Sequence, residues 1–160
     1  MKRLVSNENE ILLDKEQKAS GRKVEERYPG EPTAAFKGAT WAALLVGVAA
    51  YLIGLFNASM ELNEQGYYFA VLVFGLYSAV SLQKAVRDKD EGIQVTGIYY
   101  GISWFAVVVA ISLMAIGLYN AGSIILSEKG FYAMSFVLSL FAAITVQKNI
   151  RDTQRAKEQG

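Results

Sequence analysis

Runs without a charged residue divide this chain. They cover residues 38–60, 65–83, 92–127 and 130–147, with charged side chains between them. Because a helix that crosses a bilayer needs roughly 17–25 mostly apolar residues, these runs predict four transmembrane helices. A soluble four-helix bundle would instead keep a charged face on every helix. The pattern therefore favours an all-α integral membrane protein.

The chain also contains an internal repeat. Segments of the first half recur in the second half, first at an offset of 63 and then at an offset of 64. The matched pairs are GLFNA at 54–58 with GLYNA at 117–121, EQGYY at 64–68 with EKGFY at 128–132, and QKAVRD at 83–88 with QKNIRD at 147–152. These matches indicate a duplicated two-helix unit, with one residue inserted in the second connecting loop.

Together, the runs and the repeat predict how the chain is organised. The prediction comprises a polar, largely disordered cytoplasmic tail over 1–35, a first two-helix repeat over 36–90 (spans about 38–60 and 66–84), a second repeat over 91–152 (spans about 98–121 and 130–148), and a cytoplasmic tail over 153–160.

Each repeat contains two spans, so both copies enter the membrane from the same side. We therefore expect two tandem helical hairpins that run in the same direction, related by a pseudo-twofold axis along the membrane normal. Of the 16 lysine and arginine residues, all except Lys129 fall in the N-terminal segment up to residue 37, in the central segment 84–89 or in the C-terminal segment from residue 148 onwards. Since basic residues concentrate on the cytoplasmic side, both termini are expected in the cytoplasm.

Composition narrows the chemistry. The chain has no cysteine and no histidine, so it has no thiol chemistry and lacks the commonest general base and metal ligand. Its carboxylates fall in loops, in tails or at the ends of spans, and no acid–base pair is evident. We expect a protein that is not an enzyme, uses no cofactor or metal ion, and binds no nucleic acid.

Basic residues end the second and fourth spans at equivalent positions of the repeat: Lys84 and Arg87, and Lys148 and Arg151. The simpler interpretation is that they reach the headgroups and fix the depth of each span. The alternative is a duplicated site for anionic lipid headgroups formed by all four.

Two asparagines, Asn57 and Asn120, lie near the outer ends of the first and third spans. An amide in apolar surroundings needs a hydrogen-bond partner, commonly on a neighbouring helix. An interhelical contact or a local cap is therefore expected, and a polar lining for a small-molecule path is the alternative. Just before the second and fourth spans, Asn63 and Ser127 are candidate helix N-caps.

The repeated motifs, together with LNEQGYYFAVLV at 62–73 and SEKGFY at 127–132, closely resemble the YiaA/YiaB family of bacterial inner-membrane proteins. The resemblance runs from about residue 36 to residue 152. It is greatest to the longer, YiaA-like form, in which the two-helix YiaAB domain is duplicated. It implies a multi-pass protein of the bacterial inner membrane and implies no activity.

For function, the interpretation that remains is a non-catalytic inner-membrane protein that associates with itself, with membrane lipids or with another membrane protein. The alternative is a small oligomeric channel or transporter. Coupled transport usually places an ionisable residue within the bilayer, and the predicted spans contain none apart from Lys84 and Lys148 at their inner ends. The association hypothesis is therefore preferred.

Overall fold

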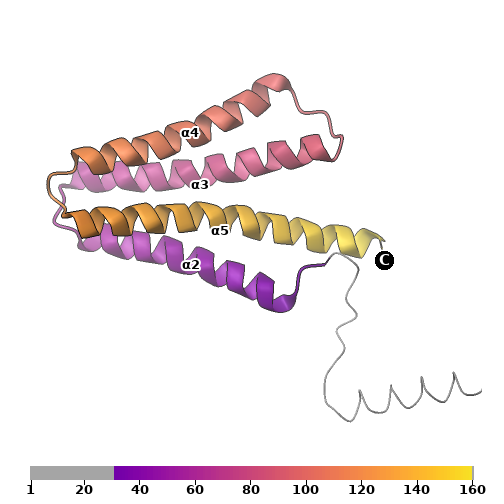
Figure 1. Cartoon of the computed structure of the whole chain (residues 1–160), viewed down its shortest axis with the longest axis horizontal. Coiled ribbons are helices and arrows are strands. Elements are labelled where there is room, and N and C mark those ends of the chain that lie inside the picture. The colour runs from indigo at the N-terminus through magenta and orange to yellow at the C-terminus, as the bar shows by residue number, and fades with distance from the viewer. Residues whose placement is uncertain (1–30, 160) are drawn as a thin grey trace, which may run out of the picture.

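The computed structural model describes residues 31–159 and shows four long antiparallel helices there (Figure 1). They are α2 (Ala34–Asn57), α3 (Leu62–Asp90), α4 (Gly97–Asn120) and α5 (Leu126–Gln159). Each is long and apolar enough to cross a membrane. The described residues contain no strand, so the predicted all-α membrane fold is confirmed. The predicted tail over 1–35 lies outside the described residues as far as residue 30, and α2 begins before its end.

The first helix of each repeat begins with the same cap. The Thr33 hydroxyl accepts a hydrogen bond from the Phe36 amide at 3.1 Å, and Thr96, 63 residues later, accepts one from the Tyr99 amide at 3.3 Å. A threonine oxygen at the N-cap satisfies an amide that has no partner within the helix. The two repeats therefore share the N-cap of their first helix as well as their apolar runs.

The prediction that Asn63 and Ser127 cap the second helices was wrong. The N-cap of helix α3 is Glu61, two residues before Asn63, and α5 begins at Leu126, one residue before Ser127. At the start of α5 the Glu128 carboxylate accepts a hydrogen bond from the Ile125 amide at 2.9 Å. A glutamate three residues into a helix can serve its start in this way, so the side chain of Ser127 is not needed there.

Both second helices continue beyond their apolar runs. Helix α3 extends to Asp90, and Gly92 then takes a φ of 74°, a left-handed conformation that glycine adopts at no steric cost. Helix α5 extends to Gln159, so residues 153–159 of the segment expected as a separate tail continue this helix. At about 1.5 Å per residue, α5 projects well past its last apolar turn.

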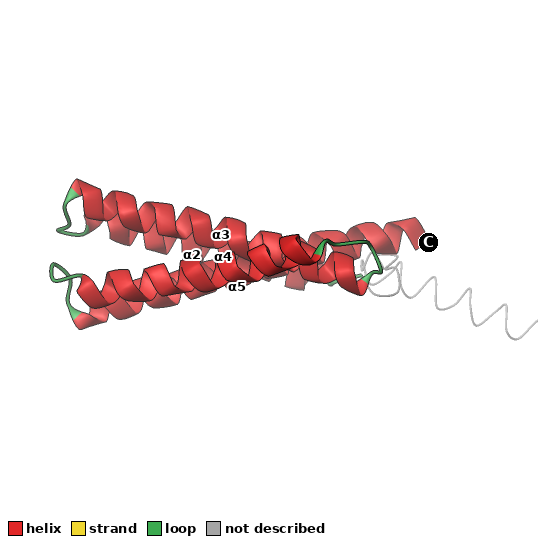
Figure 2. Cartoon of the chain, turned by 90° about the horizontal axis from the view of Figure 1, so that it is seen from above, coloured by secondary structure: helices red, strands yellow, loops and turns green. Residues whose placement is uncertain are grey.

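The helices pack mainly between repeats and only slightly within them. Helix α2 lies along α5, α3 lies along α4, and α3 also crosses α5, whereas α2–α3 and α4–α5 contacts are few. Figure 1 shows the resulting order α4, α3, α5, α2, and Figure 2 shows the helices crossing one another. The two helices of each predicted hairpin are therefore connected by a short loop, but each helix packs mainly against a helix of the other repeat.

Equivalent residues of the two repeats meet in the core. The Tyr51 hydroxyl lies 3.7 Å from the sulfur of Met114, 63 residues later. The rings of Tyr68 and Tyr132, 64 residues apart, stack with their centroids 6.1 Å apart and an interplanar angle of 16°. Residues related by a twofold axis can touch each other only close to that axis. These contacts therefore place the pseudo-twofold axis through the centre of the bundle.

Candidate functional site

A basic cavity of about 330 Å³ lies where α3 and α5 leave their apolar runs. Its charged lining comprises four basic and three acidic side chains: Arg87, Lys148, Arg151 and Arg155, with Asp90, Glu91 and Asp152. Both helices present these residues because each continues into its charged segment without a break. The cavity residues belong to the end of α3 and to the C-terminal part of α5. These segments lie towards the end of the bundle that holds the α3–α4 loop and the C-terminus (Figure 1).

One carboxylate, that of Glu91, lies among three arginines of this cavity. Its oxygens are 3.5 Å from Arg87 Nε, 3.4 Å from an Arg151 Nη and 2.9 Å from an Arg155 Nη. The Glu91 side chain is only 9% exposed. Arg87 also pairs with Asp88 at 2.9 Å, and Asp90 and Asp152 line the same cavity, so nearby carboxylates offset most of its positive charge.

The two repeat-equivalent arginines retain unused hydrogen-bond capacity. The Nε groups of Arg87 and Arg151 are buried and make no hydrogen bond within the described residues. A guanidinium carries five N–H donors, and its planar arrangement matches carboxylate and phosphate oxygens. These unused donors therefore suit an anionic oxygen ligand.

Of the four basic residues expected to form this site, the structure brings together Arg87, Lys148 and Arg151. Lys84 is exposed on α3 and does not line the cavity. Sequence reasoning missed Arg155 and Glu91. The signal for Arg155 was its spacing, since residues 148, 151 and 155 share one face of a helix, but the segment 153–160 was not expected to be helical.

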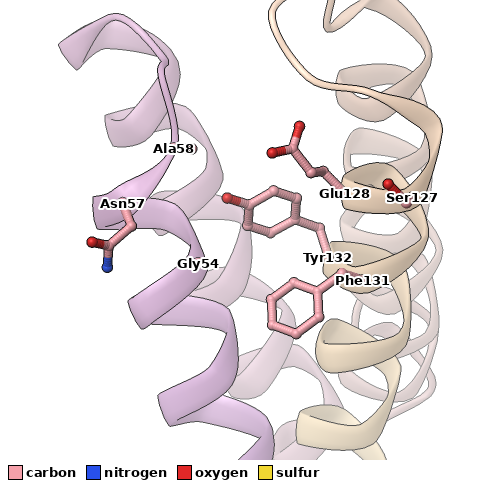
Figure 3. Close-up of a pocket in the computed structure, with 7 residues that line it drawn as sticks. All are labelled: Gly54, Asn57, Ala58, Ser127, Glu128, Phe131 and Tyr132. Atoms are coloured by element: carbon pink, nitrogen blue, oxygen red, sulfur yellow. The ribbon is translucent and has the colours of Figure 1, made fainter.

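At the opposite end of the bundle are two outer pockets that the repeat relates to each other. Every residue that lines one has its equivalent in the other, and the volumes are about 330 and 210 Å³. The larger is lined by Gly54, Asn57, Ala58, Ser127, Glu128, Phe131 and Tyr132, and its two aromatic rings lie between α2 and α5 (Figure 3). Each pocket is thus formed by the first helix of one repeat and the second helix of the other.

The asparagines of these pockets bond within their own helices. Asn57 donates to the Ile53 carbonyl at 2.7 Å, and Asn120 donates to the Ile116 carbonyl at 2.9 Å. Of the two arrangements expected for them, these bonds are the local one at the end of each helix, and an interhelical contact is not among their hydrogen bonds in residues 31–159. Such a contact occurs instead at the inner end, where buried Asn149 donates to Thr40 Oγ1 at 3.1 Å.

Sequence reasoning missed Asn149 because its repeat equivalent is Ala85, so the position did not stand out as a repeated polar residue. For metal ions, the structure between residues 31 and 159 contains no group of three acidic side chains that could hold one.

Comparison with known proteins places these features in a family. A family model described as the yiaA/B two helix domain matches residues 36–88 and again residues 99–152. The chain is 57% identical over 118 residues to "Inner membrane protein YiaA" of Escherichia coli (strain K12), an alignment that covers 74% of this chain and 81% of the relative. It is 39% identical over 67 residues to "Uncharacterized membrane protein YubF" of Bacillus subtilis (strain 168), covering 41% and 77% respectively. No solved structure matches.

Proposed function

The chain belongs to the YiaAB family and is a multi-pass protein of the inner membrane, and from this premise we propose that it is a non-catalytic protein that binds anionic lipid headgroups in its basic cavity. The observation that carries the proposal is the pair of buried Nε groups of Arg87 and Arg151, which make no hydrogen bond within the described residues. Phosphate oxygens of anionic headgroups can accept hydrogen bonds from these guanidinium groups.

The orientation of the chain supports the same proposal. The N-terminal end of α2, the α3–α4 loop and the end of α5 lie at one end of the bundle (Figure 1). All basic residues of the described chain except Lys129 belong to that end. By the positive-inside rule we place both termini in the cytoplasm, so that the cavity faces the anionic surface of the cytoplasmic leaflet.

The core favours association over conduction. Tyr51, Leu72 and Phe136 are almost fully buried at the centre of the helices, and an ion path needs polar groups or water in that position. A channel or transporter would therefore require a path between copies of the chain rather than through one copy.

The test of the proposal uses a pair of lysines that the repeat provides. Lys148 lines the cavity, whereas its equivalent Lys84 does not, and both are exposed and outside the ion pairs of the described residues. Native mass spectrometry from nanodiscs of equimolar phosphatidylglycerol and phosphatidylcholine measures which lipid is retained.

We expect the wild-type protein to retain phosphatidylglycerol preferentially. At about 1 kcal/mol per basic residue near a charged surface, Lys148→Gln should weaken this preference about fivefold, and Lys84→Gln should leave it nearly unchanged. Equal retention of the two lipids by the wild-type protein, or an unchanged preference in Lys148→Gln, would contradict the proposed function.

A further inference from the structure

The basic cavity lies close to the pseudo-twofold axis. Glu91 and Arg155 are equivalent positions of the repeat, 64 residues apart, and their side chains pair at 2.9 Å. Arg87 and Arg151 are also equivalent, and both approach the same Glu91 carboxylate. Because equivalent residues meet only near the axis, a position beside it carries a carboxylate in the first repeat and a guanidinium group in the second.

The Glu91 carboxylate is surrounded by arginines but is poorly hydrogen-bonded. The contact from an Arg151 Nη to Glu91 Oε2 has hydrogen-bond geometry, but its length of 3.4 Å exceeds the usual length of a charge-assisted bond, about 2.7–2.9 Å. Glu91 Oε1 is buried and makes no hydrogen bond within the described residues, although an Arg155 Nη lies 2.9 Å from it. A buried carboxylate without well-oriented donors recovers little of the free energy that it loses on leaving water.

The backbone of Glu91 is fixed at the end of α3, so only its side chain needs to move. The Glu91 amide donates to the Arg87 carbonyl at 2.9 Å, and the Ile93 amide donates to the Asp88 carbonyl at 2.8 Å, with Gly92 between them in the left-handed conformation. These bonds close the C-terminus of the helix. Rotation about the side-chain bonds of Glu91 therefore moves the carboxylate out of the cavity while α3 stays in place.

The arginines of α5 depend on Glu91 more than Arg87 does. Arg87 has a second partner, Asp88, at 2.9 Å. Within the described residues, Arg151 and Arg155 form ion pairs with Glu91 alone. When the Glu91 carboxylate leaves, two guanidinium groups one turn apart on α5 become available together, and such groups bind phosphate oxygens.

We propose that Glu91 is an internal competitor for the headgroup site: its carboxylate occupies Arg151 and Arg155 until the phosphate of an anionic lipid displaces it. The inference rests on the headgroup binding proposed above and adds how that binding is regulated. The phosphate has to offer the two arginines stronger hydrogen bonds than the carboxylate does, and Glu91 thereby lowers the affinity of the cavity for anionic lipid.

Three variants separate competition from total charge. Glu91→Gln removes the charge of the competitor and keeps the size of its side chain. Asp90→Asn is the control, because Asp90 lines the same cavity and gives the same change in net charge, but it is exposed and forms no ion pair within the described residues. Glu91→Asp leaves the net charge unchanged and withdraws the carboxylate from α5 by one methylene.

Retention of phosphatidylglycerol by the purified full-length variants is measured by native mass spectrometry from nanodiscs of equimolar phosphatidylglycerol and phosphatidylcholine. Glu91→Gln should strengthen retention about tenfold, because a competing set of charged contacts is lost. Asp90→Asn should strengthen it about twofold at most, since an exposed charge is screened by solvent. Glu91→Asp should lie between the wild-type protein and Glu91→Gln. Thermal unfolding in detergent checks that each variant is folded, and Glu91→Asp carries the test if Glu91→Gln is not.

Retention in Glu91→Gln no stronger than in Asp90→Asn would overturn the inference, because Glu91 would then act only through net charge. Weaker retention than wild type in Glu91→Gln or Glu91→Asp would also overturn it, since Glu91 would then hold the arginines in place for the lipid. In both cases a wild-type preference for phosphatidylglycerol would leave the headgroup proposal standing. Equal retention of the two lipids by the wild-type protein would instead contradict the headgroup proposal itself.

Discussion

At the scale of single residues, two glycines show how closely the repeats pack and where they differ. A Cβ atom at Gly54 would lie 2.8 Å from a ring carbon of Phe131, and one at Gly117 would lie 2.6 Å from a ring carbon of Tyr67. The Tyr67 hydroxyl also donates to the Leu113 carbonyl at 2.6 Å. Phe131 has no hydroxyl, so its ring is freer to move away from an added atom.

This difference leads to a prediction. Gly117→Ala should lower the free energy of unfolding by about 1–3 kcal/mol, the usual cost of overpacking a filled core, and Gly54→Ala should cost less. Thermal unfolding of the purified variants in detergent measures both. Gly101→Ala is the control, because no atom lies within 4 Å of a Cβ atom there. Equal losses at Gly54 and Gly117 would show that the tyrosine hydroxyl does not hold its ring.

At the scale of helices, the main partner of α2 is α5 and not α3, to which a short loop connects it. The closest approach includes Gly47, where an added Cβ atom would lie 2.8 Å from Ser139 Oγ and 3.1 Å from the Ser139 amide nitrogen. Small residues at such crossings let helix backbones come together in lipid, where packing rather than water exclusion drives association.

Cross-linking tests this pairing, since the chain has no cysteine of its own. The variant Gly47→Cys with Ser139→Cys should form an intramolecular disulfide under mild oxidation, because a side chain at position 47 would lie directly against the side chain of residue 139. The control pair, Gly47→Cys with Val73→Cys, joins α2 to the exposed side of α3 and should remain reduced. Efficient cross-linking of the control pair alone would mean that each hairpin packs on itself.

At the scale of the whole molecule, the two repeats are intertwined. The contacts of α2 with α5, of α3 with α4 and of α3 with α5 all join one repeat to the other. Equivalent residues such as Tyr68 and Tyr132 meet at the centre. Contacts between the two helices of one repeat therefore cannot replace the contacts that they make with the other repeat.

Dividing the chain tests this dependence. Fragments 1–92 and 93–160, separated in the α3–α4 loop next to Gly92, should associate when they are produced together, because all the main helix contacts lie between them. A tag on one fragment should then retain the other in near-equal amount after extraction in mild detergent. Recovery of each fragment as a folded monomer would contradict an intertwined arrangement.

Much of this protein follows from its sequence alone. The uncharged runs predict four spans, because a bilayer accepts no unpaired charge or backbone group over about 30 Å. The repeat predicts the pseudo-twofold relation, since similar sequences form similar helices. The basic residues that end the second and fourth spans predict three of the four basic residues of the inner cavity, Arg87, Lys148 and Arg151.

The tertiary structure decided the rest. Which helices pack together depends on the fit of small and aromatic residues across the bundle, such as Gly54 against Phe131. The apolar runs alone do not predict this pairing, because they are similar to one another in composition. The contribution of Arg155 to the basic cavity depends on how far α5 continues, and the contribution of Glu91 depends on where α3 ends. The apolar groove between α3, α4 and α5 depends on how these three helices cross. The periodicity of residues along any one helix does not predict that crossing.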